Sequence, residues 1–181
     1  RVAHFRLRTD TRFLPYGRSM IESARKTWRQ LCLRHDSKIW TPYGYKEIQN
    51  IKTGDIVYSY DKEKIIESKV VAVKCQGEDE IYKIRTAHHE IYANKDHHFP
   101  TAAGIKKKVS ELTTSDELIC FDDINALRVN YERIWEISKQ DEKTLVYDMQ
   151  VDSDCHNFIV EGTVSLNSML EDAMLVYRVS R

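Results

Sequence analysis

The sequence predicts an all-β unit over residues 32–167 with a short helical segment on either side. Between these limits, β-branched and aromatic runs follow one another, separated by turn residues at the spacing of an all-β protein. Outside them, apolar residues recur at helical intervals. Two stretches of the interior, 48–57 and 109–118, also resemble each other, which indicates a duplicated β-subdomain.

The helical prediction covers residues 19–31 and 168–179. Ser19 stands at an N-cap position with Glu22 three residues later, which is the spacing of a capping box. Ser168 opens the second segment in the same way, and apolar residues recur along one side of both segments. We therefore expect a helical fragment on each side of the β-rich interior.

The strand prediction rests on runs rich in β-branched and aromatic residues. They are DIVYSY (55–60), SKVVAVKC (68–75), EIYKIRT (80–86), HEIYA (89–93), ELICF (117–121), ERIWEIS (132–138), LVYDMQV (145–151) and HNFIVEGTVSL (156–166). The chain has only 6 glycines, so we expect Asp, Asn and Lys to form many of the turns.

The internal resemblance pairs residues at a constant offset along the chain. The pairs are Ile48 with Val109, Ile51 with Leu112, Thr53 with Thr114, Asp55 with Asp116, and Val57 with Leu118. Two stretches this short can also match by chance, but the more specific prediction is a pair of β-subdomains related by a pseudo-two-fold axis.

Composition argues against several classes of function. Lysine plus arginine equals aspartate plus glutamate, 28 of each, so the net charge gives no reason to expect a nucleic acid or a membrane surface as partner. We find no apolar run long enough to span a bilayer and no signal-peptide pattern. The 4 cysteines contain no CxxC pair, which argues against a disulfide framework or a zinc finger and favours a reducing, cytoplasmic setting.

The residues at the two edges of the interior have complementary chemistry. Cys32 is its first residue, and a cysteine thiolate can attack the carbonyl of the preceding Leu31 to form a thioester. Asn167 is its last residue, and an asparagine carboxamide can attack its own backbone carbonyl and cut the chain. Ser168 follows with a hydroxyl that can take over the acyl group. Together, these steps would excise residues 32–167 and join the ends.

These residues lie in motifs that resemble those of inteins, protein-splicing elements that share a fold with hedgehog autoprocessing domains. CLRHDSKIWTPYGYKEIQNIKTGDIVYSYD (32–61) resembles the N-terminal motif, in which a cysteine is followed by T-x-x-G and G-D-x-V. ANKDHHF (93–99) resembles the second motif, and VYDMQV (146–151) with HNFIVEGTVSLN (156–167) resembles the C-terminal motifs. The resemblance implies an all-β hedgehog/intein-type (Hint) horseshoe over 32–167, without an endonuclease domain: a mini-intein.

At the N-terminal junction, the resemblance implies that Cys32 is the first nucleophile and that His97 assists the acyl shift at the Leu31–Cys32 bond. The family has threonine where this chain has Asn94, whose amide can still donate to the scissile carbonyl. Asp148 would lie between the two junctions and assist transfer of the acyl group to the second nucleophile.

At the C-terminal junction, the resemblance implies that Ser168 is the second nucleophile and that His156 assists cyclisation of Asn167. The usual histidine before the terminal asparagine is replaced by Leu166, which cannot transfer a proton. More of the cyclisation would rest on His156, and we expect slower cleavage here. The element would act once on its own chain, as a single-turnover autocatalyst without cofactor or metal.

The flanking segments, 1–31 and 168–181, read continuously once the interior is removed. The joined sequence, around LPYGRS and EDAMLVYR, resembles portal proteins of phages with contractile tails. The resemblance implies that the flanks are exteins, the substrate of the splicing domain. It also implies an oligomeric portal as host protein, made in the cytoplasm of an infected bacterium and incorporated into the virion. We expect the chain itself to be a monomer, with neither nucleic acid nor membrane as partner.

Two alternatives remain open from the residues alone. The interior could be a metal-binding β-domain with ligands from Cys32, His35, His97, His98, Cys155 and His156, although these residues lack finger-like spacing. It could also be a non-catalytic structural insertion in a portal protein. Such an insertion predicts no chemistry at Cys32 or Asn167.

The remaining histidines and cysteines receive structural interpretations. We assign no role to His88, His89 and His98, and we expect Cys75 and Cys120 to lie in the core. Cys155 is interpreted as a packing residue, with a modulating thiol or an oxidation partner of Cys32 as the alternatives.

Overall fold

In the computed structural model, residues 31–123 and 128–167 are described, and their regular structure consists of β-strands and two 3₁₀ turns. The all-β prediction for the interior is confirmed. The helices expected at 19–31 and 168–179 lie outside the described residues, apart from Leu31. No helix in the described part of the chain is long and apolar enough to cross a membrane.

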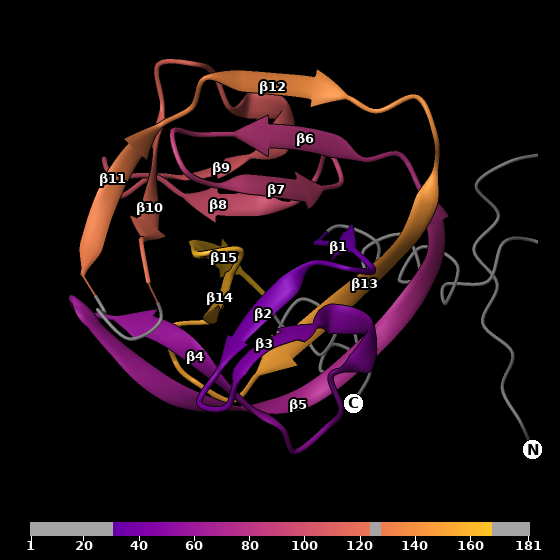
Figure 1. The fold of residues 1–181 in the computed structure, drawn as a ribbon, viewed down its shortest axis with the longest axis vertical. Coiled ribbons are helices and arrows are strands. Elements are labelled where there is room, and N and C mark those ends of the chain that lie inside the picture. Colours follow the sequence, from indigo (N-terminus) through magenta and orange to yellow (C-terminus); the bar gives the residue numbers. More distant parts are fainter. Residues whose placement is uncertain (1–30, 124–127, 168–181) are drawn as a thin grey trace, which may run out of the picture. The chain divides into compact units, whose positions relative to one another are not determined.

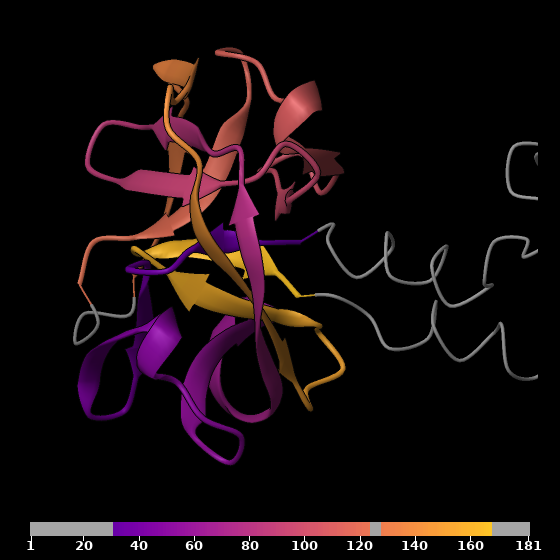
Figure 2. The ribbon, with the colours of Figure 1, turned by 90° about the vertical axis from the view of Figure 1, so that its right-hand side faces the viewer.

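The larger sheet has seven strands in the order β12-β6-β7-β1-β13-β5-β4, and all neighbours are antiparallel. These strands are β1 (Leu33–Arg34), β4 (Ile56–Asp61), β5 (Lys64–Asp79), β6 (Tyr82–Arg85), β7 (Glu90–Ala93), β12 (Glu136–Lys139) and β13 (Thr144–Val151). Two register shifts, at Val146/Tyr147 and Gln150/Val151, accentuate the bend of the paired β5 and β13, which curve across the unit in Figures 1 and 2.

The second sheet has six strands in the order β11-β10-β15-β14-β2-β3, and a separate ladder joins β8 to β9. Their bounds are β2 (Lys38–Thr41), β3 (Gly44–Glu47), β8 (His98–Pro100), β9 (Lys106–Lys108), β10 (Glu117–Phe121), β11 (Val129–Arg133), β14 (Asn157–Val160) and β15 (Thr163–Leu166). Strands β14 and β15 are buried along their whole length and lie near the centre of the unit (Figures 1 and 2).

Tight hairpin turns use few glycines, as expected from their scarcity. Strand β4 turns into β5 through Lys62 and Glu63, and β14 turns into β15 through Glu161 and Gly162. All four residues have positive φ, which matches the right-handed twist of the flanking strands. Charged residues therefore occupy turn positions for which glycine is usual.

The predicted duplication is present in the structure. The turns η2 (Ile48–Asn50) and η3 (Val109–Glu111) occupy the two similar stretches. The apolar members of the pairs are buried in one core cluster: Ile48, Ile51, Val57, Val109, Leu112 and Leu118. Strands β2–β4 of the first repeat (residues 34–61) and β8–β10 of the second (residues 94–121) lie on opposite sides of β14 and β15 (Figure 1). Two β-subdomains thus flank the hairpin that leads to Asn167.

Candidate functional site

Cys32 and Asn94 meet at the N-terminal junction. Cys32 precedes β1 and is fully buried against Ile81 and Val146. Its backbone N–H, which belongs to the Leu31–Cys32 peptide bond, donates to Oδ1 of Asn94 at 3.4 Å. The N–H of Asn94 in turn donates to the Cys32 carbonyl at 3.0 Å. Asn94 therefore holds both polar groups of the Cys32 backbone.

Asp79 fixes the orientation of the Asn94 side chain. Nδ2 of Asn94 donates to Oδ2 of Asp79, at the end of β5, at 3.2 Å. Because the amide nitrogen faces this carboxylate, the amide oxygen is the atom turned toward the Cys32 N–H. The sequence predicted Asn94 as a donor to the scissile carbonyl, and the structure adds that it is an acceptor from the scissile N–H.

His97 lies in the loop after Asn94 and is fully buried. Its Nε2 is 2.7 Å from Oγ of Ser165, and its ring packs on Phe99 with centroids 4.9 Å apart. Nδ1 makes no hydrogen bond of normal geometry with the residues described. Burial, followed by the charge of His98, lowers the pKa of His97 to about 3, so the imidazole is neutral at neutral pH.

The backbone of Leu31 opposes this downward shift in the pKa of His97. A backbone group raises the pKa of a histidine only through its carbonyl oxygen, which stabilises the imidazolium. The Leu31 carbonyl, which a Cys32 thiolate would attack, therefore lies beside the His97 ring. Through Ser165, the same ring also contacts β15, the strand that leads to the C-terminal junction.

Asn167 is buried directly after β15. Its backbone N–H donates to the carbonyl of His156 at 3.0 Å. With the amide oriented by its partners, Nδ2 donates to the same carbonyl at 2.6 Å, and Oδ1 accepts from the N–H of Val151 at 3.0 Å. The backbone and the carboxamide nitrogen of Asn167 are thus both held by His156.

His156 acts here through its backbone. It has φ of +49°, in the left-handed region, and its N–H donates to the Ser153 carbonyl at 3.0 Å. This turn directs the His156 carbonyl toward Asn167. No hydrogen bond joins the His156 imidazole to Asn167 within residues 128–167. Proton transfer by this ring therefore stays a prediction.

Asp148 is buried on β13, the strand next to β1. Its neighbour Tyr147 pairs with Leu33 of β1 in an antiparallel ladder, and the same register continued by one residue sets Asp148 opposite Cys32. Leu166 is buried as the last residue of β15. Ser168 lies outside the described residues, so its predicted role stays a prediction.

Motifs did not identify Ser165 as a site residue. Thr163 and Ser165 alternate with apolar residues in TVSL, a strand that is buried on both faces. Buried hydroxyl groups need polar partners, so this alternation is the signal that could have pointed to them. Oγ1 of Thr163 lies 3.5 Å from Sγ of Cys120, and Ser165 contacts His97.

Among the cysteines away from the N-terminal junction, Cys75 differs in burial from the prediction. Cys120 is buried, as expected, whereas Cys75 is exposed on β5. Lys74 beside it is also exposed, so neither face of β5 is covered at this point. Cys155 is partly buried and its thiol donates to Oγ of Ser153 at 3.2 Å, which fits the packing interpretation.

The ligand set of the metal-binding alternative does not assemble. Among residues 31–123 and 128–167, two groups bring metal-ligating atoms within 4.8 Å of one another, and they are His89, Cys120 and Glu132, and His88, Asp122 and Glu132. Neither group includes Cys32, His97 or His156. The junction residues therefore do not form a metal centre in this structure.

No family model matches the sequence, and no curated protein sequence matches at a significant level. Solved structures do match. The DnaB intein from Synechocystis sp. aligns with 76% of this chain and 99% of its own, with a TM-score of 0.69 and 20% identity. The gp41-1 intein aligns over 75% and 98%, with a TM-score of 0.64 and 25% identity. A bacterial intein-like domain from Clostridium thermocellum aligns over 76% and 99%, with a TM-score of 0.66 and 23% identity.

These alignments cover nearly the whole of each known domain and about three quarters of this chain. At such low identity, a structural likeness establishes the fold, while function has to be argued from the site. The antiparallel sheets and the two equivalent β-subdomains agree with the likeness. This chain therefore has the Hint fold of the inteins and intein-like domains.

Proposed function

We propose that residues 32–167 form a self-splicing mini-intein that excises itself and joins Leu31 to Ser168. The Hint fold supports this proposal. The observation that carries it is the position of His97, which is buried and neutral, lies beside the Leu31 carbonyl and is hydrogen-bonded to Ser165. One imidazole thus contacts segments that lead to both junctions.

In the first step, the thiol of Cys32 gives up its proton and its sulfur attacks the carbonyl carbon of Leu31. The C–N bond between the two residues breaks, the nitrogen takes up a proton and becomes an amine, and a thioester remains. The neutral imidazole of His97 lies beside the Leu31 carbonyl, and we propose that it relays the proton from the thiol to the leaving nitrogen. Oδ1 of Asn94 accepts from the Cys32 nitrogen before the step and can accept from the amine after it.

In the second step, the hydroxyl oxygen of Ser168 attacks the thioester, its proton leaves, and the thiolate of Cys32 departs. The first flanking segment is then an ester on Ser168. We propose that Asp148, buried on the strand next to β1, takes part in the proton transfer of this step.

In the third step, Nδ2 of Asn167 attacks its own backbone carbonyl carbon and loses a proton, while the nitrogen of Ser168 leaves with one. A cyclic imide remains on the excised domain, and the freed amine of Ser168 displaces the ester to give a peptide bond. The His156 carbonyl and the Val151 N–H hold the carboxamide for this attack. Leu166 offers no proton, so we propose the His156 imidazole as the proton donor.

The flanks are the substrate in this proposal. We propose that residues 1–31 and 168–181 belong to a phage portal protein, which would become continuous once the insertion is removed. The chemistry at the junctions does not depend on this assignment. The identity of the host protein is tested separately, by asking whether the ligated product of a longer precursor assembles into portal rings.

The splicing proposal is tested by expressing the chain under reducing conditions and measuring intact masses. We expect a product in which residues 1–31 are ligated to 168–181, together with excised 32–167. Cys32→Ala should block thioester formation and the transfer to Ser168, and therefore ligation. Asn167→Ala should retain the first acyl shift, so an added small thiol should release residues 1–31.

Two outcomes would contradict the proposal. Ligation by the Asn167→Ala chain would show that cyclisation is not the cleaving step. An intact, folded chain with no thiol-induced cleavage after Leu31 would instead favour the structural insertion, which predicts no chemistry at either junction.

A further inference from the structure

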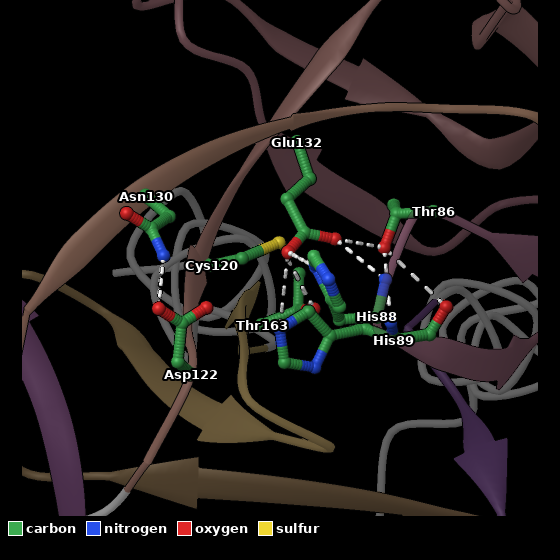
Figure 3. A network of polar contacts seen from close by, with 8 residues as sticks. All are labelled: Thr86, His88, His89, Cys120, Asp122, Asn130, Glu132 and Thr163. Atoms are coloured by element: carbon green, nitrogen blue, oxygen red, sulfur yellow. Dashed lines mark hydrogen bonds and ion pairs between the residues drawn. The ribbon is translucent and has the colours of Figure 1, made fainter.

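Away from both junctions, a second cluster of reactive side chains lies between the β6–β7 turn and strands β10 and β11. Figure 3 shows it around the carboxylate of Glu132. The ligating atoms of His89, Cys120 and Glu132 all lie within 4.8 Å of one another, and both Cys120 and Glu132 are buried. The three residues are far apart in the sequence, so the fold alone brings them together.

The spacing of these atoms suits a metal ion better than a hydrogen bond. Nε2 of His89 lies 3.7 Å from Oε1 of Glu132, which is too long for a hydrogen bond. Bonds of about 2.0–2.3 Å in a tetrahedral zinc site place neighbouring ligand atoms roughly 3.3–3.8 Å apart. The observed separation therefore falls where two ligands of one ion would lie.

His89 provides an independent sign of a missing partner. Its side chain is 90% buried, with a relative exposure of 10%, and its Nε2 has no hydrogen-bond partner in the described residues. The ring packs closely against Gly162, where a Cβ would lie 2.5 Å from Cε1 of His89. A buried imidazole nitrogen without a partner is costly, and it is aimed at the Glu132 carboxylate.

Surrounding groups hold the cluster as outer-shell residues hold metal ligands. Oε2 of Glu132 accepts from Oγ1 of Thr86 and from the His88 N–H, while Oε1 lies 2.8 Å from Nδ1 of His88 and faces Nε2 of His89. Oγ1 of Thr163 lies 3.5 Å from Sγ of Cys120 (Figure 3). Such contacts orient the ligands and are a usual part of zinc sites.

We propose that Nε2 of His89, Sγ of Cys120 and Oε1 of Glu132 bind a zinc ion. A nitrogen, a sulfur and an oxygen ligand in tetrahedral geometry are typical of zinc. A water molecule would complete the coordination, because Nδ1 of His88, 2.8 Å from Oε1 of Glu132, is at hydrogen-bonding distance from that oxygen. The thiol loses its proton on binding, and the two negative ligands then balance the charge of the ion.

The place of this site in the fold gives it a structural consequence. Cys120 of β10 pairs with Thr163 of β15, and Ser165 follows on the same face of that strand, against His97. A zinc ion would tie the β6–β7 turn, β10 and β11 together beside the strand that leads to Asn167. We therefore expect zinc to raise the midpoint of thermal unfolding.

The test uses the full chain with Cys32→Ala and Asn167→Ala, which cannot splice and has no thiol at the junction. Titration with Co²⁺ should show one equivalent bound, with a thiolate-to-metal charge-transfer absorption that Zn²⁺ removes by displacement. Cys120→Ser should abolish the charge-transfer band, and His89→Gln should weaken zinc binding at least about tenfold. The matched controls, Cys75→Ser and Cys155→Ser, should change neither.

Circular dichroism without metal establishes that each variant is folded, and Glu132→Gln replaces any cysteine variant that is not. The proposal is overturned if the charge-transfer band survives Cys120→Ser, if it disappears with Cys155→Ser, or if zinc binding is insensitive to both His89→Gln and Glu132→Gln. Absence of stoichiometric binding at micromolar zinc would also overturn it. Since the chain tested cannot splice, these outcomes are independent of the proposed function.

Discussion

The two repeats use one backbone design, and only the second presents reactive side chains to the N-terminal junction. In the first repeat, the Ser37 N–H donates to the Arg34 carbonyl at 3.0 Å, and in the second the His97 N–H donates to the Asn94 carbonyl at 3.1 Å. The carbonyls of Ser37 and His97 each accept from the first residue of the following 3₁₀ turn, at 2.9 and 2.8 Å. His97 therefore occupies the position of Ser37, and Asn94 that of Arg34.

The scaffold contacts around these positions are retained in both repeats. Asp55 accepts from Nζ of Lys46 at 2.6 Å and from a backbone N–H three residues earlier at 2.8 Å. Asp116 accepts from Nζ of Lys107 at 2.7 Å and from the corresponding backbone N–H at 2.8 Å. These backbone and ion-pair contacts are thus common to both repeats, and the side chains at Ser37 and His97 differ.

A further pair of equivalent positions lies on β4 and β10. Ser59 of β4 donates to the Asn157 carbonyl of β14 at 2.7 Å, whereas Cys120 of β10 contacts Thr163 of β15. Both side chains are buried. The duplicated framework thus contains two sets of equivalent positions. In the second repeat, these positions hold the imidazole of His97 and the thiol of Cys120.

The largest effect is expected from alanine substitutions at the equivalent positions His97 and Ser37. His97→Ala should slow the N-terminal acyl shift by about 10²–10⁴-fold, the usual worth of a general acid–base group. Ser37→Ala should leave the rate unchanged. The rate is followed as thiol-induced release of residues 1–31 from the Asn167→Ala chain. If both variants were equally slow, the role of His97 would be structural.

Between pH 6.5 and 4, the second repeat should add a pH dependence of stability through His97. The pKa of His97 falls from an ordinary 6.5 to about 3 on folding, so below pH 6.5 the unfolded chain binds a proton that the folded chain does not. This contribution to stability is therefore complete above pH 6.5 and is lost as the pH falls toward 3, with a slope of up to about 1.4 kcal/mol per pH unit.

This prediction is measured by urea unfolding of the Cys32→Ala chain at a series of pH values. His97→Gln should flatten the curve between pH 6.5 and 4, while Ser37→Ala should shift it without changing its shape. A curve whose shape is the same with and without His97 would mean that other groups determine the dependence.

The retained ion pairs should matter to stability and not to rate. Asp55→Asn and Asp116→Asn should each lower the free energy of unfolding by about 1.5–3 kcal/mol, the range for hydrogen bonds to charged groups. Asp116 should cost more, because its side chain is 14% exposed and that of Asp55 is 30% exposed. Chemical denaturation measures both, and equal acyl-shift rates are the control. If only one of the two variants lost stability, the equivalence of Asp55 and Asp116 would be contradicted.

The dependence of stability on pH in the acidic range shows in which direction the two aspartates act. The side-chain hydrogen bond from Lys46 holds the pKa of Asp55 below its usual value. At Asp116, burial raises the pKa, but the bonds from Lys107 and Thr113 outweigh it and the pKa is again lowered. Stability from both carboxylates is therefore present above the ordinary pKa of aspartate and is lost as the pH falls through the lowered values.

Sequence patterns predicted the framework because its signals are local. The similarity of 48–57 to 109–118 located both 3₁₀ turns, and the motif histidine His97 is the residue beside Leu31. The equivalence of Ser37 and His97 was missed, since their offset differs by one from that of the predicted pairs and only backbone hydrogen bonds reveal it.

Features that depend on pairing between distant strands could not be read from the sequence. Cys75 was expected in the core, but β5 and β13 leave both faces uncovered where it lies. The approach of His89 to Cys120 and Glu132 depends on how the β6–β7 turn meets β10 and β11. Composition near each residue carries no information about such contacts.

Two buried serines give the finest test of the comparison. Ser165→Ala removes the partner of Nε2 of His97, so the ring loses the contact that fixes its tautomer, and we expect the acyl shift to slow about tenfold. Ser59→Ala, at a buried position of the first repeat, should cost about 1 kcal/mol of stability with no change in rate. Nitrogen NMR shifts of His97 should change in the Ser165 variant alone. Should Ser165→Ala leave both the rate and the tautomer unaltered, the role of Ser165 would be structural, as is that of Ser59.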